Sequence, residues 1–154
     1  MLQDLKYQYQ TDLANYLAQI CTKNIQENFP HLLRFWQENH YTLIPVPLHW
    51  YRQNWRGFNQ AELIGVSLDK NLKLPFSTDL LIRSRYTSPQ VKSKDKKQRK
   101  SNLSQAFSLS SKGDTAKPRG ILLFDDVYTT GSTLKSAASV FPKNTEIFYL
   151  TLAG

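Results

Sequence analysis

Apolar side chains recur at every third or fourth position in several stretches of the chain, and this spacing predicts helices. One helix is expected over residues 9–28, with Pro30 ending it, and another over residues 59–72. A third is expected over residues 132–141, where Pro142 ends it.

Short apolar or alternating stretches between these helices predict strands. They cover residues 41–46, 80–82, 107–109, 120–124 and 146–152. The stretch 120–124 is apolar throughout, as in a central parallel strand that is covered on both faces. A strand, a helix and a second strand follow within roughly 30 residues, which is typical of a βαβ unit. The pattern therefore predicts an α/β fold, a mostly parallel central sheet with flanking helices.

Length and composition agree with one globular domain over residues 1–154, and no repeat or linker divides them. The hydrophobic content of 40% is ordinary for such a domain. No apolar run approaches the roughly 18–20 residues that span a bilayer. The first six residues lack the apolar core of a signal peptide. We therefore expect a cytoplasmic protein without membrane insertion.

The single cysteine and two of the histidines show no metal-binding pattern. Cys21 has no partner for an internal disulfide or a zinc site, and we expect it to be a small core residue. His31 and His40 lie near predicted turns without ligand-like spacing, and we expect both on the surface.

The net charge of +8 is concentrated in one segment. Residues 83–100 carry eight basic side chains and one acid, for a net charge of +7. This segment lies mostly in the polar, weakly periodic stretch 86–105, which predicts a long loop. The pattern fits either an anionic partner, phosphate or nucleic acid, or a solvated loop that aids solubility. The basic residues are Arg83, Arg85, Lys92, Lys94, Lys96, Lys97, Arg99 and Lys100.

A hydroxyl-rich loop follows the central strand and precedes a predicted helix. At the start of a helix several backbone N–H groups lack intrahelical partners and favour an anion. Gly131 permits close approach of a ligand or a positive φ. No lysine is present, so the loop is not of the GxxxxGK[ST] kind. The hydroxyls that add donors around a phosphate belong to Thr129, Thr130, Ser132 and Thr133.

Asp125 and Asp126 come directly after four apolar residues, where an unpaired carboxylate is costly to desolvate. The hydroxyls of a sugar would satisfy it, because an ionised carboxylate only accepts hydrogen bonds. The alternative is that one aspartate caps the helix and the other pairs with a surface lysine.

The segment Phe124-Asp125-Asp126-Val127-Tyr128-Thr129-Thr130-Gly131-Ser132-Thr133 closely resembles the motif with which type I phosphoribosyltransferases bind phosphoribosyl pyrophosphate (PRPP). Other stretches resemble one branch of these proteins, the ComF family, in the family's order and over nearly the whole chain. The block Arg56-Gly57-Phe58-Asn59-Gln60 is the most particular to this branch. The remaining stretches are Ile44-Pro45-Val46-Pro47-Leu48-His49, Arg83-Ser84-Arg85-Tyr86-Thr87-Ser88-Pro89-Gln90 and Arg99-Lys100-Ser101-Asn102-Leu103-Ser104-Gln105-Ala106-Phe107.

The resemblance implies a type I phosphoribosyltransferase-like core and a role for each stretch. Asp125 and Asp126 would hold the ribose hydroxyls, and residues 129–133 would hold the 5-phosphate. The basic segment would match the mobile loop that covers the site, with Arg83 and Arg85 among the binding residues. Mg²⁺ would be carried mainly by the pyrophosphate of PRPP. The loop of Val46, Pro47, Leu48 and His49 would take the place of the family's pyrophosphate-binding loop, and Arg56 is a further candidate binding residue.

Two features depart from the family's pattern. ComF-like proteins usually begin with a cysteine-rich, zinc-finger-like segment, whereas this chain starts almost at Leu5-Lys6-Tyr7 and holds only Cys21. We therefore expect a short or truncated member without that segment. Phosphoribosyltransferases also build a hood that recognises a nucleobase, and nothing in these residues resembles one.

Two functions remain open from the sequence. We favour a PRPP-binding protein with a role in competence and DNA uptake, the process with which the ComF family is associated, and with single-stranded DNA as a candidate partner of the basic segment. The alternative is an active phosphoribosyltransferase that transfers ribose 5-phosphate from PRPP to an unidentified acceptor.

Further residues after the first predicted strand could serve either function. Arg52 and Arg56 flank Trp55, and this pattern fits contacts with pyrophosphate or nucleic acid. The alternative is that the aromatic side chains belong to the core and the arginines cover the surface. His49 is a potential general acid or base, although we expect a structural role.

Overall fold

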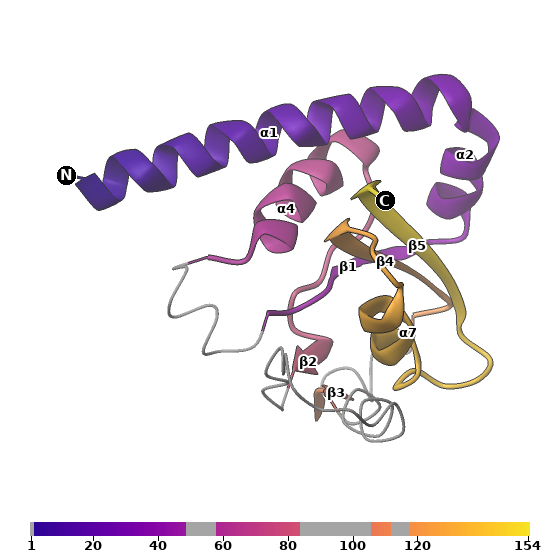
Figure 1. Cartoon of the computed structure of the whole chain (residues 1–154). Coiled ribbons are helices and arrows are strands. Elements are labelled where there is room, and N and C mark those ends of the chain that lie inside the picture. The colour runs from indigo at the N-terminus through magenta and orange to yellow at the C-terminus, as the bar shows by residue number, and fades with distance from the viewer. Residues whose placement is uncertain (1, 49–57, 84–105, 112–117) are drawn as a thin grey trace.

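The central sheet is parallel. In a computed structural model of the chain, which describes residues 2–48, 58–83, 106–111 and 118–154, its strand order is β1-β4-β5 (Figure 1). These strands are β1 (Thr42–Pro45), β4 (Gly120–Val127) and β5 (Glu146–Ala153). Two short strands, β2 (Leu81–Arg83) and β3 (Phe107–Leu109), pair antiparallel in a separate ribbon.

Helices and the ribbon cover both faces of this sheet (Figure 1). Leu43, Leu122 and Phe124 pack on one face with α1 (Leu2–Asn28), α2 (Pro30–Glu38) and α4 (Gln60–Leu72). The alternate residues Ile44 and Leu123 pack on the other face with α7 (Ser132–Ala138), β2 and β3. Since successive side chains of a strand point to opposite faces, the apolar stretch fills two cores at once. The predicted α/β class, with a parallel sheet and flanking helices, is confirmed.

Several predicted boundaries were wrong. The first helix ends at Asn28 as predicted, but Pro30 begins α2, which was not predicted; a proline in the first turn lacks an N–H that would be unpaired there anyway. The first helix begins at Leu2 rather than near residue 9, and the last helix ends at Ala138 rather than at residue 141. The central strand continues past Phe124 to Val127.

The amino end of the sheet is tightly packed. The Tyr41 hydroxyl donates a hydrogen bond to Glu146, and its ring lies 5.6 Å from that of Phe148. Burial and then the bond to Glu146 raise the pKa of Tyr41 to about 12. A Cβ atom at Gly120 would lie 2.3 Å from the Tyr41 ring, so the close approach of β4 requires glycine there.

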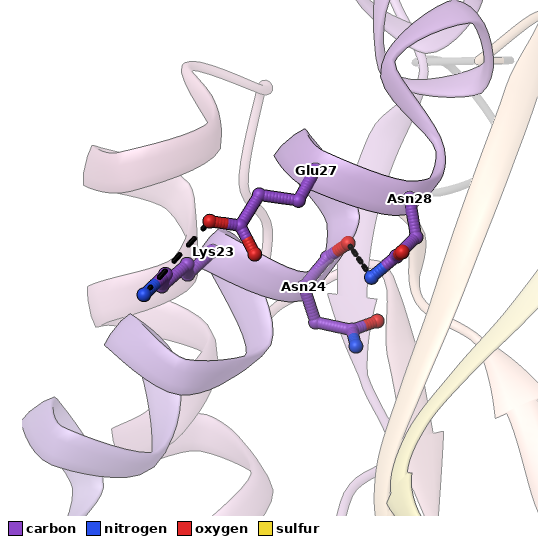
Figure 2. A network of polar contacts seen from close by, with 4 residues as sticks. All are labelled: Lys23, Asn24, Glu27 and Asn28. Atoms are coloured by element: carbon purple, nitrogen blue, oxygen red, sulfur yellow. Dashed lines mark hydrogen bonds and ion pairs between the residues drawn. The ribbon is translucent and has the colours of Figure 1, made fainter.

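The carboxyl end of α1 carries local polar contacts. The Asn28 side chain donates to the Asn24 carbonyl at 3.2 Å, and Lys23 Nζ lies 3.8 Å from Glu27 Oε1 (Figure 2). Both groups of this ion pair are exposed, so the pair adds little stability. None of the helices in the described ranges is long and apolar enough to cross a membrane.

Cys21 lies at the margin of the packed core, and the two histidines lie on the surface. His31 and His40 are exposed, as predicted. Cys21 is only half-buried and packs against the core beneath α1, where burial raises its pKa to about 11. The predicted core position of Cys21 is therefore confirmed only in part.

Candidate functional site

The acid pair lies near the carboxyl end of strand β4. Ile121 to Phe124 are fully buried, and Asp125 and Asp126 follow them half-buried. The ladder with β5 continues past the pair, since the Tyr128 N–H donates to the Ala153 carbonyl at 2.7 Å. The two carboxylates are therefore fixed by the sheet and lie at its carboxyl edge, where open α/β sheets bind ligands.

The environment of Asp125 disfavours its charge. Burial, and then the neighbouring carboxylate of Asp126, raise the pKa of Asp125 to about 6. The Asp126 N–H donates to Asp125 Oδ1 at 3.0 Å and opposes this rise, as does the positive charge of Arg83. An ionised carboxylate in this position gains from a ligand that donates hydrogen bonds to it.

Gly131 shapes the loop that follows. It adopts a left-handed conformation with φ 67° and caps α7. A Cβ atom there would lie 2.5 Å from the Tyr128 hydroxyl, so a side chain would be both strained and obstructed. The glycine therefore allows the chain to turn sharply from the acid pair into α7.

The loop presents hydroxyl and N–H donors together. Thr130 Oγ1 and Ser132 Oγ lie 2.8 Å apart, and the Ser132 N–H donates to Thr130 Oγ1 at 3.4 Å. Thr129 is exposed and Thr133 is half-buried. The first helical bond of α7 runs from Lys135 to Gly131, so the intervening N–H groups have no partner within the helix. Because α7 has only seven residues, an anion bound here would depend on these local donors rather than on a long helix dipole.

The loop after β1 lies beside the acid pair. The Val46 N–H donates to the Phe124 carbonyl at 2.8 Å, and the parallel register brings both strands to the same edge. Val46 is buried, and Pro47 and Leu48 are half-buried. The structure therefore brings the start of the predicted pyrophosphate loop next to the predicted ribose site.

Asn59 positions that loop, a role that sequence reasoning missed. Its side-chain amide donates to the Val46 carbonyl at 3.3 Å, and its Oδ1 accepts the Ala61 N–H at 3.1 Å to cap α4. Asn59 is buried. Asparagine at the first position of the predicted helix is a typical cap residue, but the contact with Val46 spans 13 residues.

Arg83 comes from the separate ribbon. Its guanidinium carbon lies 5.2 Å from the centre of the Phe107 ring, a cation–π contact that joins β2 to β3. Its charge acts on Asp125, which brings the start of the basic segment to the acid pair. The predicted site residues His49, Arg56 and Arg85 lie outside the described residues, as do Arg52 and Trp55.

The chain is similar to several curated proteins. It is 39% identical over 103 residues to Competence protein F of Haemophilus influenzae, and 34% identical over 105 residues to Competence protein ComFC of Bacillus subtilis. It is 35% identical over 103 residues to the DNA utilization protein YhgH of Escherichia coli K12. These matches cover 66%, 68% and 66% of this chain, but only 44%, 40% and 43% of the relatives. The matched region is therefore less than half of each relative.

These relatives define a class of competence and DNA utilization proteins. The similarity to these relatives supports the resemblance to the ComF family, over about two thirds of this chain. No family model matches the chain. One solved structure, described as the allosteric regulatory enzyme of purine biosynthesis, aligns with 88% of this chain and 25% of its own length, at 14% identity and a TM-score of 0.46.

Proposed function

We propose that the carboxyl end of β4 binds the ribose and 5-phosphate of a phosphoribosyl ligand, with PRPP as the first candidate, and that the protein serves competence-related DNA uptake. The observation that supports the phosphoribosyl ligand is the order of chemical groups along the short segment at the end of β4. Two half-buried carboxylates at the end of β4 are followed by a hydroxyl-rich loop, which contains a glycine at positive φ and leads into α7. The names of the relatives support the second part.

The acid pair is suited to a sugar with two adjacent hydroxyls. Asp125 and Asp126 are fixed by strand pairing, and their carboxylates repel each other. Vicinal hydroxyls would donate one hydrogen bond to each carboxylate and so offset the cost of burying them.

The loop of residues 129–133 is suited to a phosphate group that lies at the amino end of α7. Its N–H and hydroxyl donors would surround the phosphate oxygens. Mg²⁺ would arrive bound to the pyrophosphate, since Mg²⁺ sites commonly combine one or two carboxylates with phosphate oxygens of the substrate. The residues from Val46 onward would then flank the pyrophosphate, and Arg83 would add a positive charge beside the acid pair.

Calorimetric titration with PRPP and Mg²⁺ tests the ligand. Thr130→Val removes one loop hydroxyl at nearly constant shape and is expected to weaken binding about five- to tenfold, the equivalent of one hydrogen bond. Thr145→Val makes the same change at the amino end of the sheet, beyond α7, and is expected to leave binding unchanged. Absence of PRPP and ribose 5-phosphate binding by the parent would refute the proposal.

Salt-dependent titration with single-stranded DNA tests the partner. The basic segment 84–100 lies outside the described residues, and its charge motivates this test. Log affinity is expected to fall with log salt at a slope of about −0.7 per phosphate contacted. Replacing Lys94, Lys96, Lys97 and Lys100 with glutamine is expected to flatten this slope and to leave PRPP binding intact.

The opposite pattern would favour the transferase alternative. If the quadruple variant lost PRPP affinity while the parent bound no DNA even at low salt, the basic segment would serve the phosphoribosyl site. The DNA-uptake part of the proposal would then fall.

A further inference from the structure

Tyr128 connects the acid pair to the hydroxyl-rich loop. It is the first residue after β4, and its N–H donates to the Ala153 carbonyl at 2.7 Å. A Cβ atom at Gly154 would lie 2.7 Å from the Cβ atom of Tyr128, so the backbone packs closely on this side as well. The end of the sheet therefore fixes the point from which the Tyr128 side chain departs.

The ring of Tyr128 lies against Gly131. A Cβ atom at Gly131 would lie 2.5 Å from the Tyr128 hydroxyl oxygen and 2.7 Å from each of the ring carbons Cε2 and Cζ. Gly131 is buried, although residues 127–130 and Ser132 around it are exposed. The ring thus covers one side of the turn at Gly131, whose φ of 67° brings the chain back onto it.

The polar contacts within this turn are weak by comparison. Thr130 Oγ1 and Ser132 Oγ lie 2.8 Å apart, but both side chains are exposed, and water competes for such hydroxyls. The Ser132 N–H donates to Thr130 Oγ1 at 3.4 Å, which is long for a hydrogen bond. A tyrosine ring is rigid and turns about few bonds, so it is better suited than these contacts to keep the turn in one conformation.

The geometry points to Tyr128 as a positioning residue for the phosphate of the ligand, an inference that rests on the proposed function. The ring holds the turn at Gly131, and the turn sets the places of the Thr130 and Ser132 hydroxyls and of the N–H groups that would surround the phosphate. A loop that is already ordered binds more tightly, because the ligand does not have to order it. In this role the ring of Tyr128 matters and its hydroxyl does not.

Removal of the Tyr128 ring is expected to leave the fold intact. Tyr128 is 41% exposed, and it packs in neither of the two hydrophobic cores that the described residues form. Substitutions at the surface, away from such cores, usually change stability little. A loss of affinity in a Tyr128 variant can therefore be separated from a loss of folding by denaturant unfolding of the same variant.

Titration with ribose 5-phosphate and with inorganic phosphate, followed by backbone amide signals in two-dimensional NMR spectra, tests this role. Tyr128→Leu removes the ring and is expected to weaken binding of both ligands about tenfold, because each would then have to order the turn. Tyr128→Phe keeps the ring and is expected to restore the affinity of the parent. Tyr16→Leu makes the same change at an exposed tyrosine of α1 and is expected to leave both affinities within about twofold.

The pair of ligands distinguishes phosphate positioning from an effect on the acid pair. An equal loss for both ligands is expected for Tyr128→Leu, whereas the double variant Asp125→Asn with Asp126→Asn is expected to weaken only ribose 5-phosphate. A loss confined to ribose 5-phosphate in Tyr128→Leu would contradict the role of the ring.

A double variant tests the contact between the ring and Gly131. Gly131→Ala would push the ring away from the turn, so Tyr128→Leu in that background is expected to add little further loss of affinity. Fully additive losses, equal affinity of Tyr128→Leu and the parent, or a loss in Tyr128→Phe as large as in Tyr128→Leu would overturn the inference while the proposed function stands. A parent that binds neither ligand would refute the proposed function, and this inference with it.

Discussion

The two ends of the central sheet use carboxylates in opposite ways. At the amino end, Glu146 accepts a hydrogen bond from Tyr41, whose ring packs among aromatic side chains and against Gly120. At the carboxyl end, Asp125 and Asp126 lie side by side, and the pKa of Asp125 is raised. The first carboxylate has a donor within the fold, whereas the pair repel each other.

This difference distinguishes polar groups that stabilise the fold from polar groups that are proposed to bind a ligand. A polar group that the fold itself satisfies stabilises the fold, as Tyr41 does for Glu146. Two like charges held together lower stability, and under the proposed function a ligand would donate hydrogen bonds to them. Variants at the amino end should therefore change stability, and variants at the carboxyl end should change ligand affinity.

The largest expected effect comes from removing both charges of the acid pair. Asp125→Asn with Asp126→Asn is expected to weaken PRPP binding by about 1.5–3 kcal/mol for each lost charge-assisted hydrogen bond. Calorimetry measures the affinity, and circular dichroism is expected to show an intact fold. An unfolded double variant, with PRPP affinity retained in any folded fraction, would mean that the pair is structural.

The next effect tests the amino end. Gly120→Val places a branched side chain where a Cβ atom would lie 2.3 Å from Tyr41, and it is expected to lower the free energy of unfolding by about 1–3 kcal/mol. Denaturant unfolding measures this loss. Ligand affinity of the folded fraction is expected to be unchanged, and a selective loss of affinity would contradict the separation of the two ends.

Much of the fold and of the candidate site could be predicted from the sequence, but from different kinds of signal. The parallel strands and flanking helices follow from local periodicity, and the acid pair and Gly131 follow from adjacency in the chain. The extension of β4 to Val127 was missed because pairing with β5 overcomes the low strand propensity of two aspartates. The contact of Asn59 with Val46 was missed because it depends on packing between distant segments.

Tertiary packing also explains the remaining differences. The cation–π contact between Arg83 and Phe107 joins residues whose link runs through the pairing of β2 with β3, which periodicity does not give. The first helix ends before Pro30 as predicted, but the helix that begins at Pro30 was missed, because proline is excluded from a helix interior and tolerated in the first turn.

The pH dependence of binding sharpens the comparison. Since the pKa of Asp125 is raised to about 6, a ligand that needs the ionised form is expected to bind up to about tenfold more weakly at pH 5 than at pH 7. Inorganic phosphate, which lacks the ribose, serves as the control for titration of the phosphate itself. An equal change for ribose 5-phosphate and inorganic phosphate would contradict the role of Asp125.

The same pKa shift predicts the stability of the free protein. The folded pKa of Asp125 lies above its ordinary value of 3.8, so the folded state binds more protons between about pH 4 and pH 6. The contribution of this group to stability is therefore present below that window and is lost as the pH rises through it. Asp125→Asn is expected to remove this slope in unfolding experiments.

The smallest expected effect is at the tyrosine. Tyr41→Phe removes the hydrogen bond to Glu146 but keeps the ring, and it is expected to cost about 0.5–1.5 kcal/mol of stability. Thermal unfolding measures the loss, and PRPP affinity is expected to remain that of the parent. A stability equal to the parent's would show that the bond contributes nothing.

The most direct measurement of the central claim is the map of amide signals on titration with ribose 5-phosphate. Binding at the carboxyl end of β4 predicts the largest shifts at Asp125, Asp126 and residues 129–133, with little change at Tyr41 and Glu146. Shifts confined to the amino end of the sheet, or no saturable shift at Thr130 and Gly131, would contradict the account.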